Sequence, residues 1–286
     1  MEFVTYNIQY GKGVDEQINL DRIISEVSGA DVIALQEVER FWPRSGMTDQ
    51  VQEISERLEN YYWVYGPGVD VHLPNSTPTS NQRCQFGNMI LSTSPILFSR
   101  HHLLPKRGST GPTSIQRSAI EATIDLGDTR IRVTSVHLTH LSSATRLPQV
   151  QRLLEIHQKA VFEGAPVSGD IAVLNMPEQF VDQFVPTHAV LMGDFNAQPD
   201  SHEYSAIVGP VSDYGGRISS PDGFMDAWTV AGNDRMSGHT SDVNDIPAVL
   251  DYCFVSSSLI NQVTSCRVDS DATGSDHYPL WLQLDL

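Results

Sequence analysis

The sequence predicts an α/β fold in which β-sheets pack against one another and helices lie outside. Strand-like apolar runs recur along all 286 residues, and helical patterns stand between only some of them. Strict alternation of strands and helices would instead favour a doubly wound parallel sheet. We expect a single domain over residues 1–286, because α/β sandwiches and barrels reach this length as one unit.

Strands are expected where short apolar runs end at turn signals. In chain order they cover residues 2–9, 31–37, 61–65, 87–92, 119–125, 130–138, 188–193, 249–256 and 277–285. The segment DLGDTR, at 125–130, predicts a tight hairpin turn between two of these strands.

Helices are expected where apolar residues share one stripe, as Ile18, Ile23 and Val27 do. The expected helices cover residues 15–28, 47–59, 146–160 and 201–208. Two stretches rich in Gly, Pro and polar residues predict loops, at 67–85 and 161–187. The second is long for a connection without regular structure, which is typical of a lid or a binding loop.

The charge of the chain bears on its partners. There are 35 Asp and Glu residues against 18 Lys and Arg, a formal net charge of −17. Proteins that bind nucleic acid without sequence preference neutralise its phosphates with Lys and Arg. The acidic balance therefore disfavours a nucleic-acid partner without excluding one, and no feature identifies a protein partner.

Targeting signals and cysteines bear on the compartment. No basic segment precedes an apolar one at the start of the sequence, and no apolar run approaches the roughly 20 residues of a membrane span. We therefore expect a cytoplasmic protein without a transmembrane segment. Cys84, Cys253 and Cys266 are odd in number and show no CxxC spacing, which predicts buried thiols rather than disulfides or a zinc site.

Polar residues stand at the ends of several apolar strands. The run AVLM at 189–192 is followed by GDFN, and side chains two residues apart on a strand share a face, so Asp194 and Asn196 are expected to point the same way. A buried carboxylate is costly unless it is paired or binds a metal. Several polar residues at strand ends therefore predict one shared polar centre. Besides Asp194 and Asn196, this centre is expected to contain Asn7, Glu37, His137, His140, Asp251, Asp276 and His277.

Each of these residues also has a purely structural explanation. Asn7 fits a turn, Glu37 fits the start of a charged helix, and His137 fits a core histidine with satisfied hydrogen bonds. Asp251 could pair with an arginine, and GDFN could be a turn before a helix. Taken one by one, these explanations do not account for the fact that all of the residues occur together in this order along the chain.

The ordered motifs TYNIQYG, LQEV, FGNMILS, SVHLTHL, MGDFNA, LDYCFVS and GSDHYPL resemble the endonuclease/exonuclease/phosphatase superfamily. They span residues 5–280, which is nearly the whole chain. The resemblance implies a four-layer α/β/β/α sandwich, in which two mixed β-sheets pack face to face with helices outside. It also implies hydrolysis of a phosphate ester with a divalent metal, at a site at one end of the two sheets.

The resemblance implies a metal-binding role for three residues. Glu37 resembles the principal metal carboxylate, Asn7 its amide neighbour, and Asp276 an acid near the metal. A site of Glu, Asp and Asn oxygens suits Mg²⁺ or Mn²⁺, whereas zinc prefers His and Cys. Asp194 and Asn196 resemble the pair that orients the nucleophile and contacts the phosphate or the metal.

The resemblance also implies roles around the histidines. Asp251 resembles the acid that hydrogen-bonds the last histidine, and His277 resembles either the general base or the group that binds the scissile phosphate. His137 resembles the second histidine, which contacts the phosphate or assists the leaving group. Asn88, in FGNMILS, and His140 are expected close to the substrate.

Charge and loop composition bear on the substrate. Arg117, in SIQRSAIEA, is either a surface charge on an edge strand or a clamp for phosphate, whereas Lys106 and Arg107 fit a solvated loop. The two loops contain or adjoin a set of aromatic, His and Met residues, which suits a small or lipid-linked phosphate ester unless these side chains merely pack the loops down. The set comprises Trp63, Tyr65, His72, Phe86, Phe162, Met176, Phe180 and Phe184.

Two other functions compete with this one. The enzymatic alternative is a DNA or RNA nuclease of the same superfamily. An inert binding module that keeps the fold is disfavoured, because Glu37, Asp251 and His277 are all present.

Overall fold

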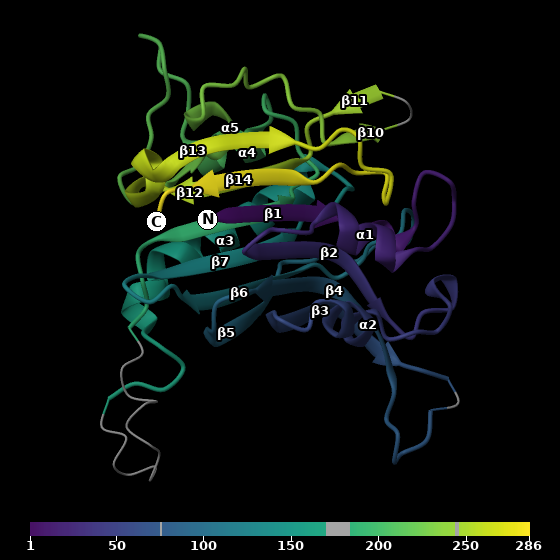
Figure 1. The fold of residues 1–286 in the computed structure, drawn as a ribbon. Coiled ribbons are helices and arrows are strands. Elements are labelled where there is room, and N and C mark those ends of the chain that lie inside the picture. The colour runs from purple at the N-terminus through teal and green to yellow at the C-terminus, as the bar shows by residue number, and fades with distance from the viewer. Residues whose placement is uncertain (75, 170–183, 244–245) are drawn as a thin grey trace.

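The computed structural model describes residues 1–74, 76–169, 184–243 and 246–286. Two six-stranded mixed sheets pack face to face, and helices cover both outer faces (Figure 1). The layer between the sheets is filled by apolar side chains from both of them, including Phe3, Ile90, Val133, Met192 and Val255. The expected four-layer α/β/β/α sandwich is confirmed.

The first sheet has the strand order β13 (Val263–Val268), β14 (Leu280–Leu284), β1 (Glu2–Asn7), β2 (Val32–Arg40), β4 (Arg83–Ser92) and β3 (Tyr62–His72). The neighbours β1 and β2 run parallel, and the other pairs run antiparallel. The outer face is covered by α1 (Leu20–Glu26) and α2 (Gln50–Arg57), whose Ile23 and Ile54 pack against Leu35 of the sheet.

The second sheet has the strand order β5 (Ile96–Leu103), β6 (Ser118–Asp125), β7 (Arg130–His137), β8 (Ala189–Asp194), β12 (Asp251–Ser256) and β9 (Phe224–Asp226). Here β7 and β8 run parallel, and the other pairs run antiparallel. Its outer face is covered by α3 (Ser143–Glu163) and α4 (His202–Val208). Outside these two layers the described residues also form the short helix α5 (Ala227–Val230) and the two strands β10 (Ser241–Val243) and β11 (Ile246–Ala248).

The helices expected in the first half begin later than predicted because their caps lie inside the predicted ranges. The side chain of Asn19 accepts a hydrogen bond from the backbone of Arg22 and starts α1, and Asp49 starts α2 in the same way through Gln52. The third helix is longer than predicted and ends at Glu163.

The loop expected at 67–85 is strand at both of its ends, in β3 up to His72 and in β4 from Arg83. Gly66, Pro67 and Gly68 are typical of a turn. A bulge between Pro67 and Val69 accommodates them instead, and β3 continues to His72. Strands β5, β9, β10, β11 and β13 were not predicted, because β5, β9 and β13 lie at sheet edges and β10 and β11 are three residues each. The hairpin at 125–130 is confirmed, and Leu126 N donates to Thr129 O at 2.9 Å.

The stretch expected as a lid at 161–187 is anchored away from the polar strand ends. The 21 residues of α3 carry the chain about 30 Å from His140. At the far end, Arg100 binds Gly164 O, and Arg132 Nε donates to Pro186 O at 2.9 Å. Met176 and Phe180 lie outside the described residues.

The remaining expectations concern cysteines and membrane spans. All three cysteine side chains are buried. Among the helices within the described ranges, none combines the length and the apolar character needed to cross a membrane.

Candidate active site

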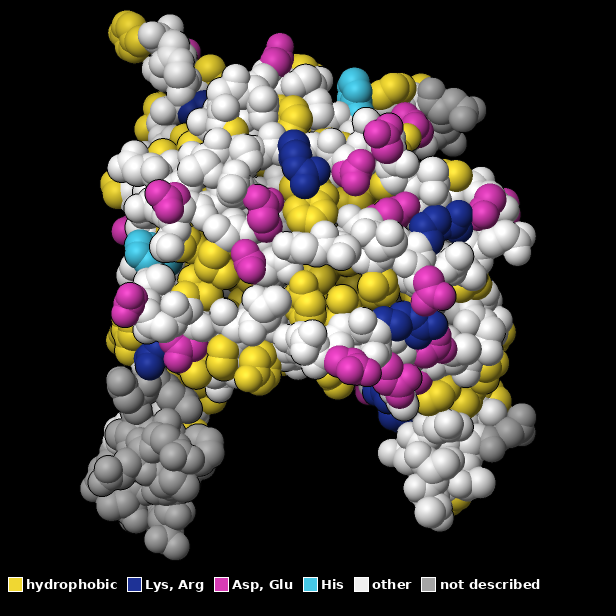
Figure 2. All heavy atoms as spheres, in the orientation of Figure 1, with side chains coloured by type: hydrophobic (Ala, Val, Ile, Leu, Met, Phe, Trp, Pro, Cys, Tyr) yellow, Lys and Arg dark blue, Asp and Glu magenta, His cyan; other side chains and the backbone are white. Residues whose placement is uncertain are grey.

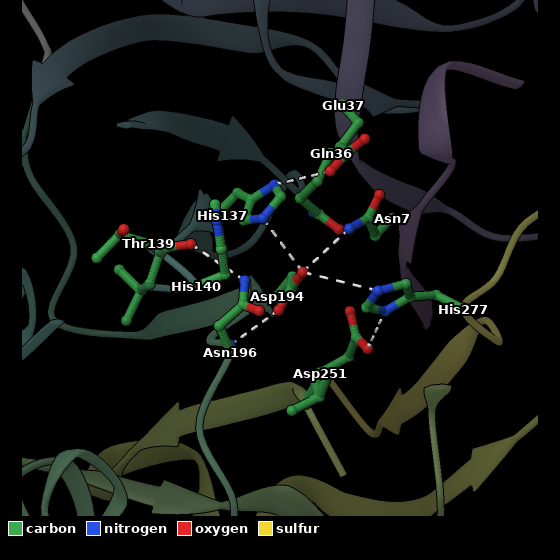
Figure 3. Close-up of polar contacts among 12 residues, drawn as sticks. Asn7, Gln36, Glu37, His137, Thr139, His140, Asp194, Asn196, Asp251 and His277 are labelled. Atoms are coloured by element: carbon green, nitrogen blue, oxygen red, sulfur yellow. Dashed lines mark hydrogen bonds and ion pairs between the residues drawn. The ribbon is translucent and has the colours of Figure 1, made fainter. Parts of the chain in front are cut away.

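The polar residues meet where the two parallel strand pairs end. Asn7, the last residue of β1, lies beside Gln36 of β2, and His137 lies beside Asp194 at the end of β7 and β8. Asp251, the first residue of β12, pairs with Asp194 from the other side. The two sheets therefore bring their polar ends together at one end of the sandwich (Figure 3).

Asp194 is at the centre of this group. Its Oδ2 accepts a hydrogen bond from Asn7 Nδ2 at 3.0 Å and lies 3.2 Å from His137 Nε2 and 3.8 Å from His277 Nε2 (Figure 3). Burial raises the pKa of Asp194 to about 7, although His277 acts to lower it. A carboxylate with a pKa near neutrality is suited to accept a proton from water.

Asp194 and Asn196 come together by a turn rather than by strand alternation. Strand β8 ends at Asp194, and Asn196 N donates to Asp194 Oδ1 at 2.8 Å, so the acid caps its own turn. The preceding residue must be glycine, because a Cβ on Gly193 would lie 1.9 Å from the carbonyl oxygen of Val136. The GDFN sequence thus sets the position of Asp194 through backbone geometry.

Glu37 does not end its strand, as the sequence predicts, nor does it start a helix. Strand β2 continues to Arg40 through a bulge between Leu35 and Val38, and Glu37 has a left-handed φ of 62°. Its side chain is 19% exposed, and its ionic neighbour is His137, whose Nδ1 lies 3.9 Å from Oε1. Within the described chain the carboxylate accepts no hydrogen bond, so its oxygens are free for a cation.

The two histidines have opposite charge states. Burial would lower the pKa of His277, but Asp251, whose Oδ2 lies 2.7 Å from Nδ1, raises it to about 10. Burial, with Arg117 and His277 nearby, holds the pKa of His137 well below its usual value. His277 is therefore an imidazolium at neutral pH, and His137 is a neutral ring whose Nε2 lies 3.2 Å from Asp194 Oδ2.

This difference predicts a pH response of the metal-free protein. His277 is expected to titrate near pH 10 and His137 to remain neutral at pH 7, as read from imidazole NMR shifts. Since the folded pKa of His277 exceeds its unfolded value near 6.5, its charge stabilises the fold below about pH 6.5, and this stabilisation is lost as the pH rises towards 10. In Asp251→Asn the pKa of His277 should fall, because burial then dominates; a His277 ring that is neutral at pH 7 in the wild type would contradict the assignment.

Arg117 is buried, which excludes the surface-charge interpretation. It is 5% exposed, and its Nε and Nη1 atoms find no hydrogen-bond partner among the described residues. His137 Nδ1 and Asp251 Oδ1 are likewise buried, and they too have no hydrogen-bond partner among the described residues. Buried polar atoms are nearly always satisfied in folded proteins. These four atoms retain hydrogen-bonding capacity for a polar ligand, and the two on Arg117 offer positive charge.

Three predicted residues lie at the margin. Asp276 is exposed, and its Oδ2 accepts a hydrogen bond from Gln9 Nε2 at 2.7 Å. His140 is exposed, and partial burial together with Arg117 and Arg146 lowers its pKa. Asn88 Nδ2 donates to Ser118 O at 2.8 Å and thereby joins the two sheets, so contact of Asn88 with substrate stays a prediction.

Other residues of the site went unassigned at the sequence level. Gln36 Nε2 donates to Ser135 Oγ at 3.0 Å and links β2 to β7 behind the site. Ser275 Oγ donates to Asn7 O at 2.7 Å and fixes the segment that carries His277. Ser275 lies within the GSDHYPL motif, so the motif could have identified it as a site residue. The contact of Gln36 with the other sheet depends on the fold and could not be predicted from the sequence.

Comparisons with known proteins agree on one family and one fold. The model of the endonuclease/exonuclease/phosphatase family matches residues 4–277. A family protein from Beutenbergia cavernae is similar in structure, with a TM-score of 0.68 and 19% identity over 100% of this chain and 71% of that one. The human nocturnin catalytic domain with bound sulfate has a TM-score of 0.63 and 18% identity, over 100% of this chain and 94% of that one.

A mannosyl-6-phosphatase from Bacteroides thetaiotaomicron has a TM-score of 0.60 and 16% identity, over 100% of both chains. No curated protein matches the chain significantly. At these identities the solved structures establish the fold alone.

Proposed function

Because the chain belongs to the endonuclease/exonuclease/phosphatase family, we propose that it hydrolyses a small-molecule or lipid-linked phosphate ester with a divalent metal. Proteins of this family are generally phosphoester hydrolases. The observation that carries the proposal for this chain is the buried Arg117, whose nitrogens lack partners among the described residues and which interacts electrostatically with Glu37 and Asp194. These groups complement a phosphate and the water that attacks it.

Enzymes of the family use divalent metals, and the site has suitable donors. Ligand atoms of Asp194, Asp251 and His277 lie within 4.8 Å of one another, but they already bond to neighbours in the site. Glu37 accepts no hydrogen bond among the described residues, so we place Mg²⁺ or Mn²⁺ on Glu37. Asn7 and Asp276 are its neighbours there, and to bind the metal they would exchange their hydrogen bonds with Gln9 for it. When bound, such a metal neutralises charge on the phosphate and polarises its oxygens.

We assign each residue of the site one role in the reaction. Asp194 orients the attacking water and accepts its proton, because its pKa is near 7. His277, held charged by Asp251, binds an oxygen of the scissile phosphate, so of its two possible roles we favour phosphate binding over general base. His137 and Asn196 contact the phosphate from the side of β7 and β8, and Arg117 neutralises its remaining charge.

Charge supports a small or lipid-linked substrate over nucleic acid. The net charge is −17, and on the face shown in Figure 2 the Lys and Arg side chains are scattered singly among acidic ones. A nuclease that binds a duplex needs a continuous basic surface to neutralise successive phosphates. The exposed Lys106 and Arg107 are two adjacent basic residues and do not form such a surface.

The proposal is tested with chelator-stripped protein assayed with and without added Mg²⁺ or Mn²⁺. The panel holds plasmid DNA, abasic duplex, bis-p-nitrophenyl phosphate, p-nitrophenyl phosphate, sphingomyelin and inositol phosphates, with His277→Ala as the blank. We expect metal-dependent cleavage of small or lipid esters, no cleavage of DNA, and no activity in the blank. DNA cleavage that disappears in His277→Ala would instead establish the nuclease alternative.

A further inference from the structure

A constrained loop beside Glu37 carries Arg44 next to the site. After β2 the chain turns through Phe41 and Met47, which have left-handed φ values of 58° and 60°. The tip of the loop is a 3-10 turn, Pro43–Ser45, which contains Arg44. Left-handed residues other than glycine are uncommon, and they persist where the surroundings determine the conformation.

The guanidinium of Arg44 is held from two sides. Its Nε donates to Glu39 Oε1 at 2.7 Å, and its Cζ lies 4.3 Å from the centre of the Tyr10 ring. Gln50 holds both Glu39 and Tyr10 in place. Its Oε1 accepts a hydrogen bond from Glu39 N at 3.0 Å, and its Nε2 donates one to Tyr10 O at 2.7 Å. The Arg44 side chain is nevertheless 47% exposed, so donors remain for a ligand.

Arg44 and Arg117 lie against one aromatic ring. The Cζ atoms of Arg44 and Arg117 are 5.7 Å and 5.8 Å from the centre of the Phe86 ring, and that ring is 6.5 Å from the His137 ring. Burial raises the pKa of Glu37, and both arginines act against this rise. Two guanidiniums therefore stand close to the same carboxylate, one buried within the site and one at its rim.

Neutralisation of Glu39 does not account for the whole arrangement. Both contacting nitrogens of Arg44, Nε and Nη2, approach the single oxygen Oε1 of Glu39. The other oxygen, Oε2, is buried and has no partner among the described residues. A guanidinium placed only to pair with a buried carboxylate would engage both oxygens with its fork. Arg44 is instead displaced onto Tyr10 and towards Phe86.

Building on the proposed function, we propose that Arg44 binds a second phosphate group of the substrate, so the substrates are small molecules with two phosphates. Arg117 contacts the phosphate that is hydrolysed, and Arg44 contacts the other one. A guanidinium fork matches phosphate oxygens, and Arg is the residue best suited to this contact. The rings of Phe86 and Tyr10 offer apolar surface to the carbon skeleton between the two phosphates.

The test compares bisphosphates with their matched monophosphates in the presence of Mn²⁺ or Mg²⁺. The pairs are glucose 1,6-bisphosphate with glucose 6-phosphate, fructose 1,6-bisphosphate with fructose 6-phosphate, and adenosine 3′,5′-bisphosphate with adenosine 5′-monophosphate. We expect kcat/KM to be about tenfold or more higher for at least one bisphosphate. Arg44→Gln should raise KM for that bisphosphate by about the same factor and leave its kcat within about threefold, so that the preference for the bisphosphate over its matched monophosphate is lost.

Two further variants separate this role from stability. Arg57→Gln removes an arginine that pairs with Asp21 away from the site, and it should change neither KM value. Glu39→Gln combined with Arg44→Gln removes both charges, so no buried carboxylate is left unpaired, and it should show the same loss of bisphosphate preference. Calorimetry of bisphosphate and monophosphate binding to the metal-free protein gives a readout that does not depend on turnover.

The outcomes are distinguishable. Equal kcat/KM for all pairs, unchanged in Arg44→Gln, would overturn this inference and leave the proposed function intact. Absence of metal-dependent hydrolysis of any ester would contradict the proposed function, and calorimetry would still decide whether Arg44 favours the bisphosphate. Selective hydrolysis of oligonucleotides that is lost in Arg44→Gln would place the second phosphate in a nucleic-acid backbone and overturn the small-molecule assignment.

Discussion

Asp194→Asn is expected to lower kcat/KM for the hydrolysed ester by about 10³-fold. The amide cannot accept a proton from water at neutral pH. It would also present hydrogens either to Asn7 Nδ2, which lies 3.0 Å from the replaced oxygen and donates to it, or to His137 Nε2, which lies 3.2 Å from that oxygen. The loss should appear mainly in kcat, measured at saturating Mg²⁺ or Mn²⁺.

The matched control for this change is Asp200→Asn. Asp200 follows the same strand by six residues and is exposed, so the same substitution there should leave kcat/KM within about twofold. The thermal midpoint of each variant shows whether folding is affected. Turnover of Asp194→Asn within a few-fold of the wild type would exclude the assigned role of Asp194.

Arg132→Met is expected to lower the free energy of unfolding by about 3–5 kcal/mol. Arg132 and Glu121 are each 2% exposed, and Nη1 lies 2.9 Å from Oε2. Arg132 also donates to Pro186 O and contacts His157 Nδ1 at 3.0 Å, so its removal leaves a buried carboxylate and two other acceptors without their partner. Urea unfolding at neutral pH measures the loss.

Two controls isolate the buried charge. Glu121→Leu combined with Arg132→Met removes both charges and should recover most of the loss, because no ion is then left unpaired. The exposed pair of Arg152 and Glu155, 40% and 42% exposed at 2.7 Å, provides the comparison. Arg152→Met should cost less than about 1 kcal/mol. If Arg132→Met also cost less than about 1 kcal/mol, the expected large loss would be contradicted, and water would have to reach Glu121 once the arginine is gone.

The sequence was most informative where local chemistry decides the structure. Apolar runs that end in polar residues located the ends of β1, β7 and β8, and thus Asn7, His137 and Asp194. Such runs are visible without the fold, because burial of both strand faces requires apolar side chains in succession. The family resemblance supplied the two packed sheets, which the runs alone did not specify.

The sequence was least informative where structure depends on strand register. The bulge at Glu37 results from the pairing of β2 with β4, and nothing in LQEV marks it. The burial of Arg117 depends on the packing of one sheet over the other. Arg44 was missed for the same reason, since its neighbours Tyr10 and Phe86 come from distant parts of the chain.

The pairing of the first strand with the last has a consequence for synthesis of the protein. Strand β1 lies between β2 and β14, and the residues that meet in the site are far apart in sequence, since Asn7 and its partner Asp194 are 187 positions apart. The nascent chain exposes one edge of β1 until Leu280–Leu284 has left the ribosome. Because His277 emerges just before this strand, completion of the candidate site and protection of that edge arrive together in synthesis.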